Sequence, residues 1–186
     1  MDNQSCIPNP PISAHEDIEL PMGANMNIPQ TSGRPARAYI HGGPLAPTVN
    51  GMVNFRDVPG GVMVCAQISG LPTYRPAPPD GNPIGPHGFH IHERGDCTPG
   101  TAANPFPGTG EHWNPTNQPH GNHPGDFPVL FSNNGSANMC FFTNKFRVSD
   151  VIERSVVIHQ CPDDYRTQPA GNSGPKVACG VIRENY

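Results

Sequence analysis

The chain has 186 residues, which is enough for one domain with its own hydrophobic core. Its 11 lysines and arginines are outnumbered by 15 acidic residues, and the net charge of −4 argues against a nucleic-acid partner. No apolar run approaches the ~20 residues of a membrane helix, so no membrane partner is expected.

The first 34 residues are polar and contain several prolines. They predict an irregular N-terminal arm, ahead of a single domain over residues 35–186. The chain start lacks the basic residues and the apolar centre of a signal peptide. The expected location is therefore cytoplasmic, or secreted or cell-envelope if a leader is missing from this sequence.

From residue 36 onward, strand-like runs alternate with turns rich in glycine and proline. Proline is excluded from central strands, and none occurs between Val129 and Cys161. The letters SNNG at residues 132–135 predict a hairpin turn, and residues 149–155 a short helical turn. The strand-like runs cover residues 36–43, 50–58, 60–71, 88–95, 128–142, 154–161 and 177–185. This pattern predicts an all-β sandwich or barrel.

Three segments are too long to be hairpin turns: residues 72–87, 96–128 and 160–176. Long loops in a compact domain are uncommon and are often functional. The first is rich in proline, and the other two contain or adjoin most of the remaining histidines.

The run GFHIHERGDC places His90 and His92 two residues apart in a predicted strand. Side chains alternate between the faces of a strand, so these two imidazoles share one face, about 6–7 Å apart. They could reach one metal ion, or they could be a hydrogen-bonded or solvent-facing pair. The spacing alone does not choose between these interpretations.

The rest of the chain favours metal. His112, His120, His123 and Asp126 lie within one loop and form a sufficient ligand set for tetrahedral zinc. His90, His92 and His159 remain, and all-nitrogen sites suit Cu(II). Seven candidates fill two four-coordinate sites if one loop histidine serves both ions through its two ring nitrogens.

Five segments, in this order, resemble the copper/zinc superoxide dismutase family: GFHIHERGDC, EHWNP, HGNHPGD, VVIHQCPDD and GNSGPKVACGVI. The resemblance covers roughly residues 36–182, and the cysteine in GDC is similar to that of the bacterial branch. It implies an eight-stranded Greek-key β-barrel or sandwich with long metal-binding and electrostatic loops. It also implies superoxide as the substrate and a homodimer, with a monomer as the alternative.

By that resemblance, the copper ligands are His90, His92, His112 and His159. The zinc ligands are His112, His120, His123 and Asp126, with His112 as the bridging imidazolate. Asp163 matches the carboxylate that joins the two sites through hydrogen bonds to ligand histidines. Cys97 and Cys179 match the disulfide that ties the metal loop to the last strand.

One departure concerns the rim of the site, where Lys176 stands in place of the family's arginine. Lysine keeps the positive charge but loses the planar fork. Because the substrate is an anion and the chain is net negative, a local positive field must offset the overall charge. We expect Lys176, with Arg166 as a further candidate, to supply it.

Other cysteines and histidines have no partner that the sequence identifies. Cys65 and Cys140 lie in apolar strands, which favours buried free thiols, whereas the status of Cys6 stays open. Cys161 would share the face of His159 in an extended segment, so thiolate ligation is conceivable there. Among the histidines, His15 and His41 lack an assigned role, and His87 has the parity to face away from His90.

The function implied by the resemblance is disproportionation of superoxide to oxygen and hydrogen peroxide, with copper as the redox ion and zinc bridged through His112. A non-catalytic metal-binding or copper-handling protein on the same fold is the alternative. A zinc-stapled scaffold is a third interpretation, under which His90 and His92 would be idle. The complete set of histidines at the copper positions favours the enzyme.

Overall fold

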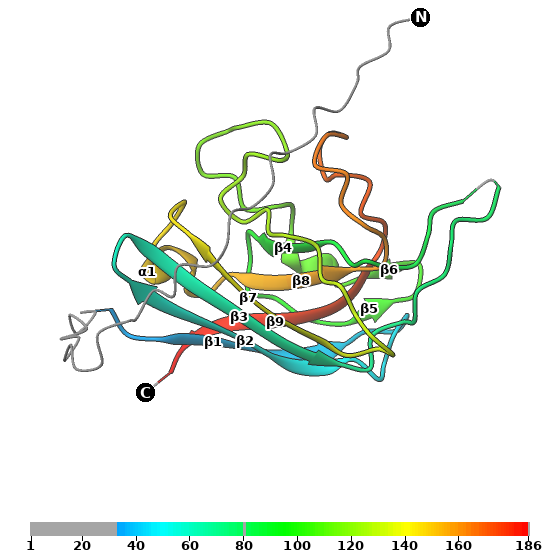
Figure 1. Ribbon diagram of the computed structural model, residues 1–186, viewed down its shortest axis with the longest axis horizontal. Coiled ribbons are helices and arrows are strands. Elements are labelled where there is room, and N and C mark those ends of the chain that lie inside the picture. Colours follow the sequence, from blue (N-terminus) through cyan, green and yellow to red (C-terminus); the bar gives the residue numbers. More distant parts are fainter. Residues whose placement is uncertain (1–32, 80, 186) are drawn as a thin grey trace, which may run out of the picture.

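The structure is a computed structural model that describes residues 33–79 and 81–185. Cys6 and all but the last two residues of the predicted arm therefore lie outside the described residues. The main feature of the structure is a seven-stranded antiparallel sheet with the order β4-β8-β9-β1-β2-β3-β7 (Figure 1). The strands are β1 Ala36–Gly42, β2 Asn50–Val58, β3 Gly61–Ser69, β4 Phe89–His92, β7 Ala137–Thr143, β8 Ser155–His159 and β9 Lys176–Glu184. Small elements complete the fold: the β5 Gly100–Thr101 and β6 Asn104–Pro105 pair, the 3₁₀ turn η1 Pro107–Thr109 and the helix α1 Val148–Val151.

The strands form where the apolar pattern predicts them. In the outer strands, which are β1, β2, β3 and β7, one face is buried and the other is more exposed. In β3, Val62, Val64, Ala66 and Ile68 point inward, while the residues between them are partly or fully exposed. The short strands β4 and β8 are buried on both faces. The all-β class is therefore confirmed. Among the described residues, no helix has the length and apolar character required to span a bilayer.

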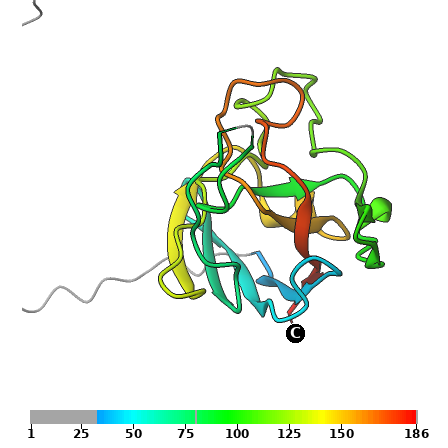
Figure 2. The ribbon, with the colours of Figure 1, turned by 90° about the vertical axis from the view of Figure 1, so that its right-hand side faces the viewer.

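The sheet curls on itself, as the side view shows (Figure 2). The outer edge of β4 is covered by the segment that the sequence predicts as a strand beginning at residue 128. Leu130 and His87 exchange two backbone hydrogen bonds, and Phe127 N–H donates to Phe89 O at 3.2 Å. The pairing along this edge consists of isolated bridges, which also join His90 to Asp126 and His92 to His112, and not of a continuous strand. The sheet therefore has seven strands where the family resemblance implies eight. The SNNG turn is confirmed, since Asn133 and Ser136 pair across it.

The structure contains two disulfides, and one of them corrects a prediction. Cys97 bonds Cys179, as the resemblance implies. Cys65 and Cys140, interpreted from the sequence as buried free thiols, also bond each other. The apolar strands around them suggested burial, but both cysteines have the parity of the outward face and lie directly opposite each other on β3 and β7. Of the described cysteines, Cys161 is free and buried.

Candidate metal centre

Two long loops rise on the same side of the sheet, over the ends of β4 and β8 (Figures 1 and 2). The loop before β7 carries three histidines and Asp126, and the loop between β8 and β9 carries Asp163. His90 and His92 come from β4, and His159 ends β8. The register of β8 against β9 shifts between Ile158 and His159. Such irregularities re-aim a side chain at the end of a strand, here toward the loops.

The first group contains the strand histidines and one loop histidine, all of them buried: His90, His92, His112 and His159. One ligand atom from each lies within 4.8 Å of the others. The rings of His90 and His92 are 6.5 Å apart, as expected for neighbours on one face of a strand. His92 Nε2 and His159 Nε2 approach to 3.3 Å. The sequence-predicted copper set is therefore brought together, although its role as a ligand set stays a prediction.

Backbone carbonyls outside the cluster fix two rings of this group, those of His92 and His159. His92 Nδ1 donates to Gly110 O at 2.9 Å, and His159 Nδ1 donates to Gly174 O at 3.0 Å. Both glycines have positive φ, 73° and 71°, a backbone conformation that favours glycine. Because a carbonyl can only accept, the proton must sit on Nδ1, and the Nε2 lone pair of each ring faces inward.

The second group contains the other loop residues and shares His112: His112, His120, His123 and Asp126. The Nδ1 atom of each histidine lies 3.2 Å from a carboxylate oxygen of Asp126. His123 Nε2 donates outward to Gln118 O at 3.1 Å. Burial alone would raise the pKa of Asp126, but the hydrogen bond from His112 and the charge of His120 lower it to about 2. Asp126 is thus an anion at the centre of three imidazoles.

Asp163 joins the two groups. Its carboxylate is buried and accepts from His90 Nε2 at 2.7 Å and from His120 Nε2 at 2.8 Å. A Cβ on Gly171 would overlap this carboxylate, so only glycine lets the backbone pass there. Asp163 therefore orients one ring from each group and leaves the Nδ1 atoms of His90 and His120 facing the interior.

The inward nitrogens provide a test of whether metal ions fit. Among the described residues, four buried side-chain polar atoms lack a hydrogen-bond partner, and three of them are His90 Nδ1, His112 Nε2 and His120 Nδ1. His120 Nδ1 has only its ionic contact to Asp126 at 3.2 Å, and the other two nitrogens have no partner in the described part of the chain. Buried polar atoms are normally hydrogen-bonded, so three such nitrogens in one cluster are suited to bind ligands such as metal ions. His112 is distinctive because its Nε2 lies in the first group and its Nδ1 in the second. The residues fit two metal ions with His112 between them.

Burial also holds the strand histidines in the form that binds metals. Desolvation, aided by the neighbouring imidazoles, lowers the pKa of His90 and His92 well below the ordinary value. Burial is also the main cause that lowers the pKa of His159 to about 3. Neutral imidazole is the ligand form, so these side chains are ready to coordinate at neutral pH without losing a proton.

Lys176 opens β9 beside the first group and is half-buried. Its Nζ donates to Thr109 Oγ1 at 2.7 Å, Gly110 O at 3.2 Å and Phe106 O at 3.4 Å. Burial lowers the pKa of Lys176, while the charge of Glu111 opposes that shift. An ammonium group has three N–H donors, and all three are used here. Lys176 therefore presents a fixed positive charge rather than a free donor.

Other predicted residues lie further out or have a different role. Arg166 is exposed on the outer loop, where its backbone N–H donates to Asp164. The sequence identifies no partner for His87, and the structure provides two. His87 is fully buried, with Nδ1 2.9 Å from His159 O and Nε2 3.3 Å from Pro72 O. No metal-ligand group among the described residues includes Cys161.

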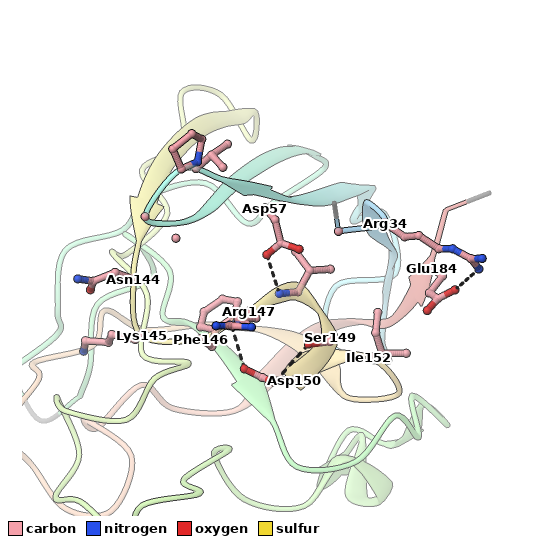
Figure 3. Close-up of a pocket in the computed structure, with 16 residues that line it drawn as sticks. Arg34, Asp57, Asn144, Lys145, Phe146, Arg147, Ser149, Asp150, Ile152 and Glu184 are labelled. Carbon is pink, nitrogen blue, oxygen red and sulfur yellow. Dashed lines mark hydrogen bonds and ion pairs between the residues drawn. The ribbon is translucent and has the colours of Figure 1, made fainter. Parts of the chain in front are cut away.

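A separate hollow of about 990 Å³ lies between the β2–β3 turn, α1 and the end of β9 (Figure 3). None of the predicted ligands lines it. Two of its carboxylates are engaged with the backbone: Asp57 accepts from Val148 N–H at 3.2 Å, and Asp150 accepts from Arg147 N–H at 2.9 Å. The bond to Asp57 ties α1 to the end of β2.

Comparison with known proteins decides the family. A family model described as copper/zinc superoxide dismutase (SODC) matches residues 49–182. The chain belongs to the copper/zinc superoxide dismutase family. The matched range contains every residue of the two histidine groups, together with Asp163, Lys176 and both disulfides.

Individual relatives agree with this assignment. A Cu-Zn superoxide dismutase of Deinococcus radiodurans is 36% identical over 152 residues, covering 73% of this chain and 78% of that protein. One of Legionella pneumophila is 34% identical over 145 residues, with coverages of 74% and 80%. The solved Cu/Zn superoxide dismutase from Brucella abortus superposes with a TM-score of 0.64 at 27% identity, covering 79% of this chain and 98% of that one. Copper and zinc are the metals of this family, and the histidine groups could hold them.

Proposed function

We propose that this chain is a superoxide dismutase, which converts two superoxide anions and two protons into oxygen and hydrogen peroxide. The observation that carries the proposal is the position of His112. Its Nε2 is buried without a partner in one histidine group, and its Nδ1 lies 3.2 Å from Asp126 in the other. A buried structural histidine would normally pair both ring nitrogens, whereas His112 pairs only Nδ1.

The ligand assignment follows the two groups. His90 Nδ1 and the Nε2 atoms of His92, His112 and His159 would hold copper, and the Nδ1 atoms of the loop histidines with Asp126 would hold zinc. Copper would supply one-electron redox chemistry at this site, whereas zinc has none.

The chain's own residues would bring the substrate to the site. Superoxide is an anion and the chain carries a net charge of −4, so encounter depends on local positive charge. Lys176 supplies that charge next to the first group, and its three hydrogen bonds hold it in place. Since none of its N–H donors is free, Lys176 would guide the anion by its electric field. The backbone around Gly110 fixes the position of the ammonium group relative to the first group.

Proton delivery would use His112. Its Nε2 faces the first group and has no partner within the fold, so whenever this nitrogen does not hold the metal it can hold a proton and pass it to the reduced oxygen species. Asp126 stays anionic and lies beside Nδ1, so the ring keeps its orientation while the proton is on Nε2. Electron and proton chemistry would thus meet at one imidazole.

Metal analysis combined with a dismutation assay tests the proposal. About one copper and one zinc per chain together with turnover supports the enzyme. Copper without turnover would indicate the copper-handling alternative, and zinc alone would indicate a scaffold. Both of those outcomes contradict the proposal.

The organisation of the chain and its assembly are further parts of the proposal. The family resemblance supports a catalytic domain over residues 35–186, preceded by the arm over residues 1–34, and a homodimer with a monomer as the alternative. Sedimentation of the full chain and of a chain beginning at residue 35 distinguishes these states. Equal activity per chain in both forms is the expected result.

A further inference from the structure

The Cys65–Cys140 disulfide lies on the outward face of the sheet. Its two cysteines are direct partners in the β3–β7 ladder, with their Cα atoms 4.1 Å apart. Val64 and Ala66, on either side of Cys65, are buried, so Cys65 points the other way. Cys140 is exposed and Cys65 is half-buried. A dissolved thiol can therefore approach this bond at Cys140.

The second disulfide has no exposed cysteine, although both of its cysteines line a hollow of about 260 Å³. Cys179 has 0% exposure in β9. Cys97 is partly buried and packs with Phe106 and Val157 in a small apolar cluster that includes Cys179. The two disulfides thus differ in access, although both join segments distant in sequence. Exchange with thiols depends on access to a sulfur atom, so the outward pair should react first.

The outward disulfide shares its face of the sheet with Arg37 and Arg56. Across the sheet, Arg37, Asn54, Cys65 and Cys140 form one continuous row of partners, and Arg37 Nε donates to Asn54 Oδ1 at 2.7 Å. Arg56 lies in the neighbouring row on the same face.

Negative charge is absent from that face of the outer strands. The described strands β1, β2, β3 and β7 contain one acidic residue, Asp57. Its side chain points to the opposite face from Arg56 and lines the hollow beside α1. The face would thus attract an anionic thiol more than a neutral or cationic one.

We propose that Cys140 is a modification site for small thiols that carry carboxylate groups. The thiolate attacks Cys140 Sγ, a new S–S bond forms between the thiol and Cys140, and the Cys65–Cys140 bond breaks. Cys65 leaves with the electron pair as a thiolate, which takes up a proton from water. The exchange needs no other oxidant or reductant, because the attacking thiol is oxidised as Cys65 is reduced.

The modification would act on the metal loops through chain connectivity. The disulfide spans 75 residues of sequence, and the ring that it closes contains His90, His92, His112, His120, His123 and Asp126. At the edge of the sheet, β7 has β3 as its only strand partner in the described sheet. Opening the bond frees this edge without touching a ligand. The modified protein should therefore melt at a lower temperature with its ligand set intact.

The test uses the full, metal-loaded chain with its free thiols blocked by alkylation beforehand. Reduced glutathione is added without oxygen, and cysteamine, a positively charged thiol, serves as the matched probe. We expect one glutathione on Cys140, a newly alkylatable Cys65 and an intact Cys97–Cys179 bond by peptide mass mapping. Glutathione should react several-fold faster than cysteamine relative to their rates with a small model disulfide.

Two variants sharpen the result. An Arg37→Gln, Arg56→Gln double variant should slow glutathione several-fold and leave the cysteamine rate unchanged, and a Cys65→Ser, Cys140→Ser double variant should give no adduct. An adduct that forms first at Cys97 or Cys179 would overturn the proposal. So would the absence of any adduct below denaturing conditions, or arginine variants that slow both thiols equally.

Discussion

The two histidine groups differ in the part of the molecule that holds them. Three members of the first group come from β4 and β8, which pair with each other, and so the sheet positions these rings. The second group comes from a single loop, over residues 112–126. His112 belongs to both.

This difference indicates separate roles for the two groups. The strand group is positioned by the β-ladder and by the carbonyls of Gly110 and Gly174, whatever occupies it. The loop group is held by hydrogen bonds between loops, such as those of His120 to Asp163 and Gln168, and by the local bond of His123 to Gln118. Such loops gain further order from a bound ion. The first group should therefore determine reactivity, and the second should determine the stability of the loop.

The largest effect should follow from removing a strand ligand. We expect His159→Ala to lose copper and to lower dismutation by at least about 100-fold, because a four-ligand set loses one buried nitrogen. Zinc should remain, since His159 is not in the loop group. Metal content and activity are measured together, with His41→Ala, which changes an exposed histidine, as the control. Parallel loss of both metals would show that the two groups are not separate.

Removing the carboxylate of the loop group should have the opposite effect, with zinc lost and copper retained. Asp126→Asn deletes the anion beside three imidazoles, and we expect zinc affinity to fall by at least about 100-fold. Copper should bind, while the melting temperature falls and protease cuts the loop sooner. Asp96→Asn, an exposed change in the same loop, is the matched control. An unchanged melting temperature would argue against a stabilising role for the loop group.

A smaller effect on both groups is expected from Asp163. Its carboxylate accepts from His90 and from His120, so Asp163→Asn should weaken copper and zinc binding together, each by about 10–100-fold. Competition with chelators of graded strength measures the two affinities. Asp164→Asn changes the next residue, which is exposed and bonded to Thr167, and should leave both affinities unchanged. A loss confined to one metal would mean that Asp163 does not join the groups.

The smallest effect concerns substrate guidance. Lys176→Ala should lower activity about 10-fold at low salt and much less at high salt, because salt screens the field of a charge at the rim. Lys176→Arg keeps the charge and should stay close to the original activity. The rate is measured over a range of ionic strengths with metal content held constant. An equal loss at all salt concentrations would assign Lys176 a structural role.

Much of the candidate site could be predicted because its spacing is local. The alternation of a strand places His90 and His92 on one face, and the loop spacing brings His120 and His123 to Asp126. Recognition of the sequence motifs added Asp163 and the Cys97–Cys179 bond. The carbonyls that fix the rings were not predicted, although the glycines at 110 and 174 were a usable signal, since both adopt positive φ.

Features that depend on distant register were missed. The Cys65–Cys140 bond requires β3 and β7 to pair residue for residue across a separation of 75 residues, which no local pattern specifies. The partners of His87 depend on where the loop over residues 72–87 passes the end of β8. The count of seven strands likewise depends on how the segment around Leu130 meets β4.

The central claim, that His112 lies between two different ions, is tested most directly by anomalous diffraction from crystals of the two-metal protein, recorded at the copper and zinc absorption edges. The account predicts a copper peak on the Nε2 side of His112, among His90, His92 and His159, and a zinc peak on its Nδ1 side beside Asp126. A single peak, or two peaks on the same side of the ring, would contradict it.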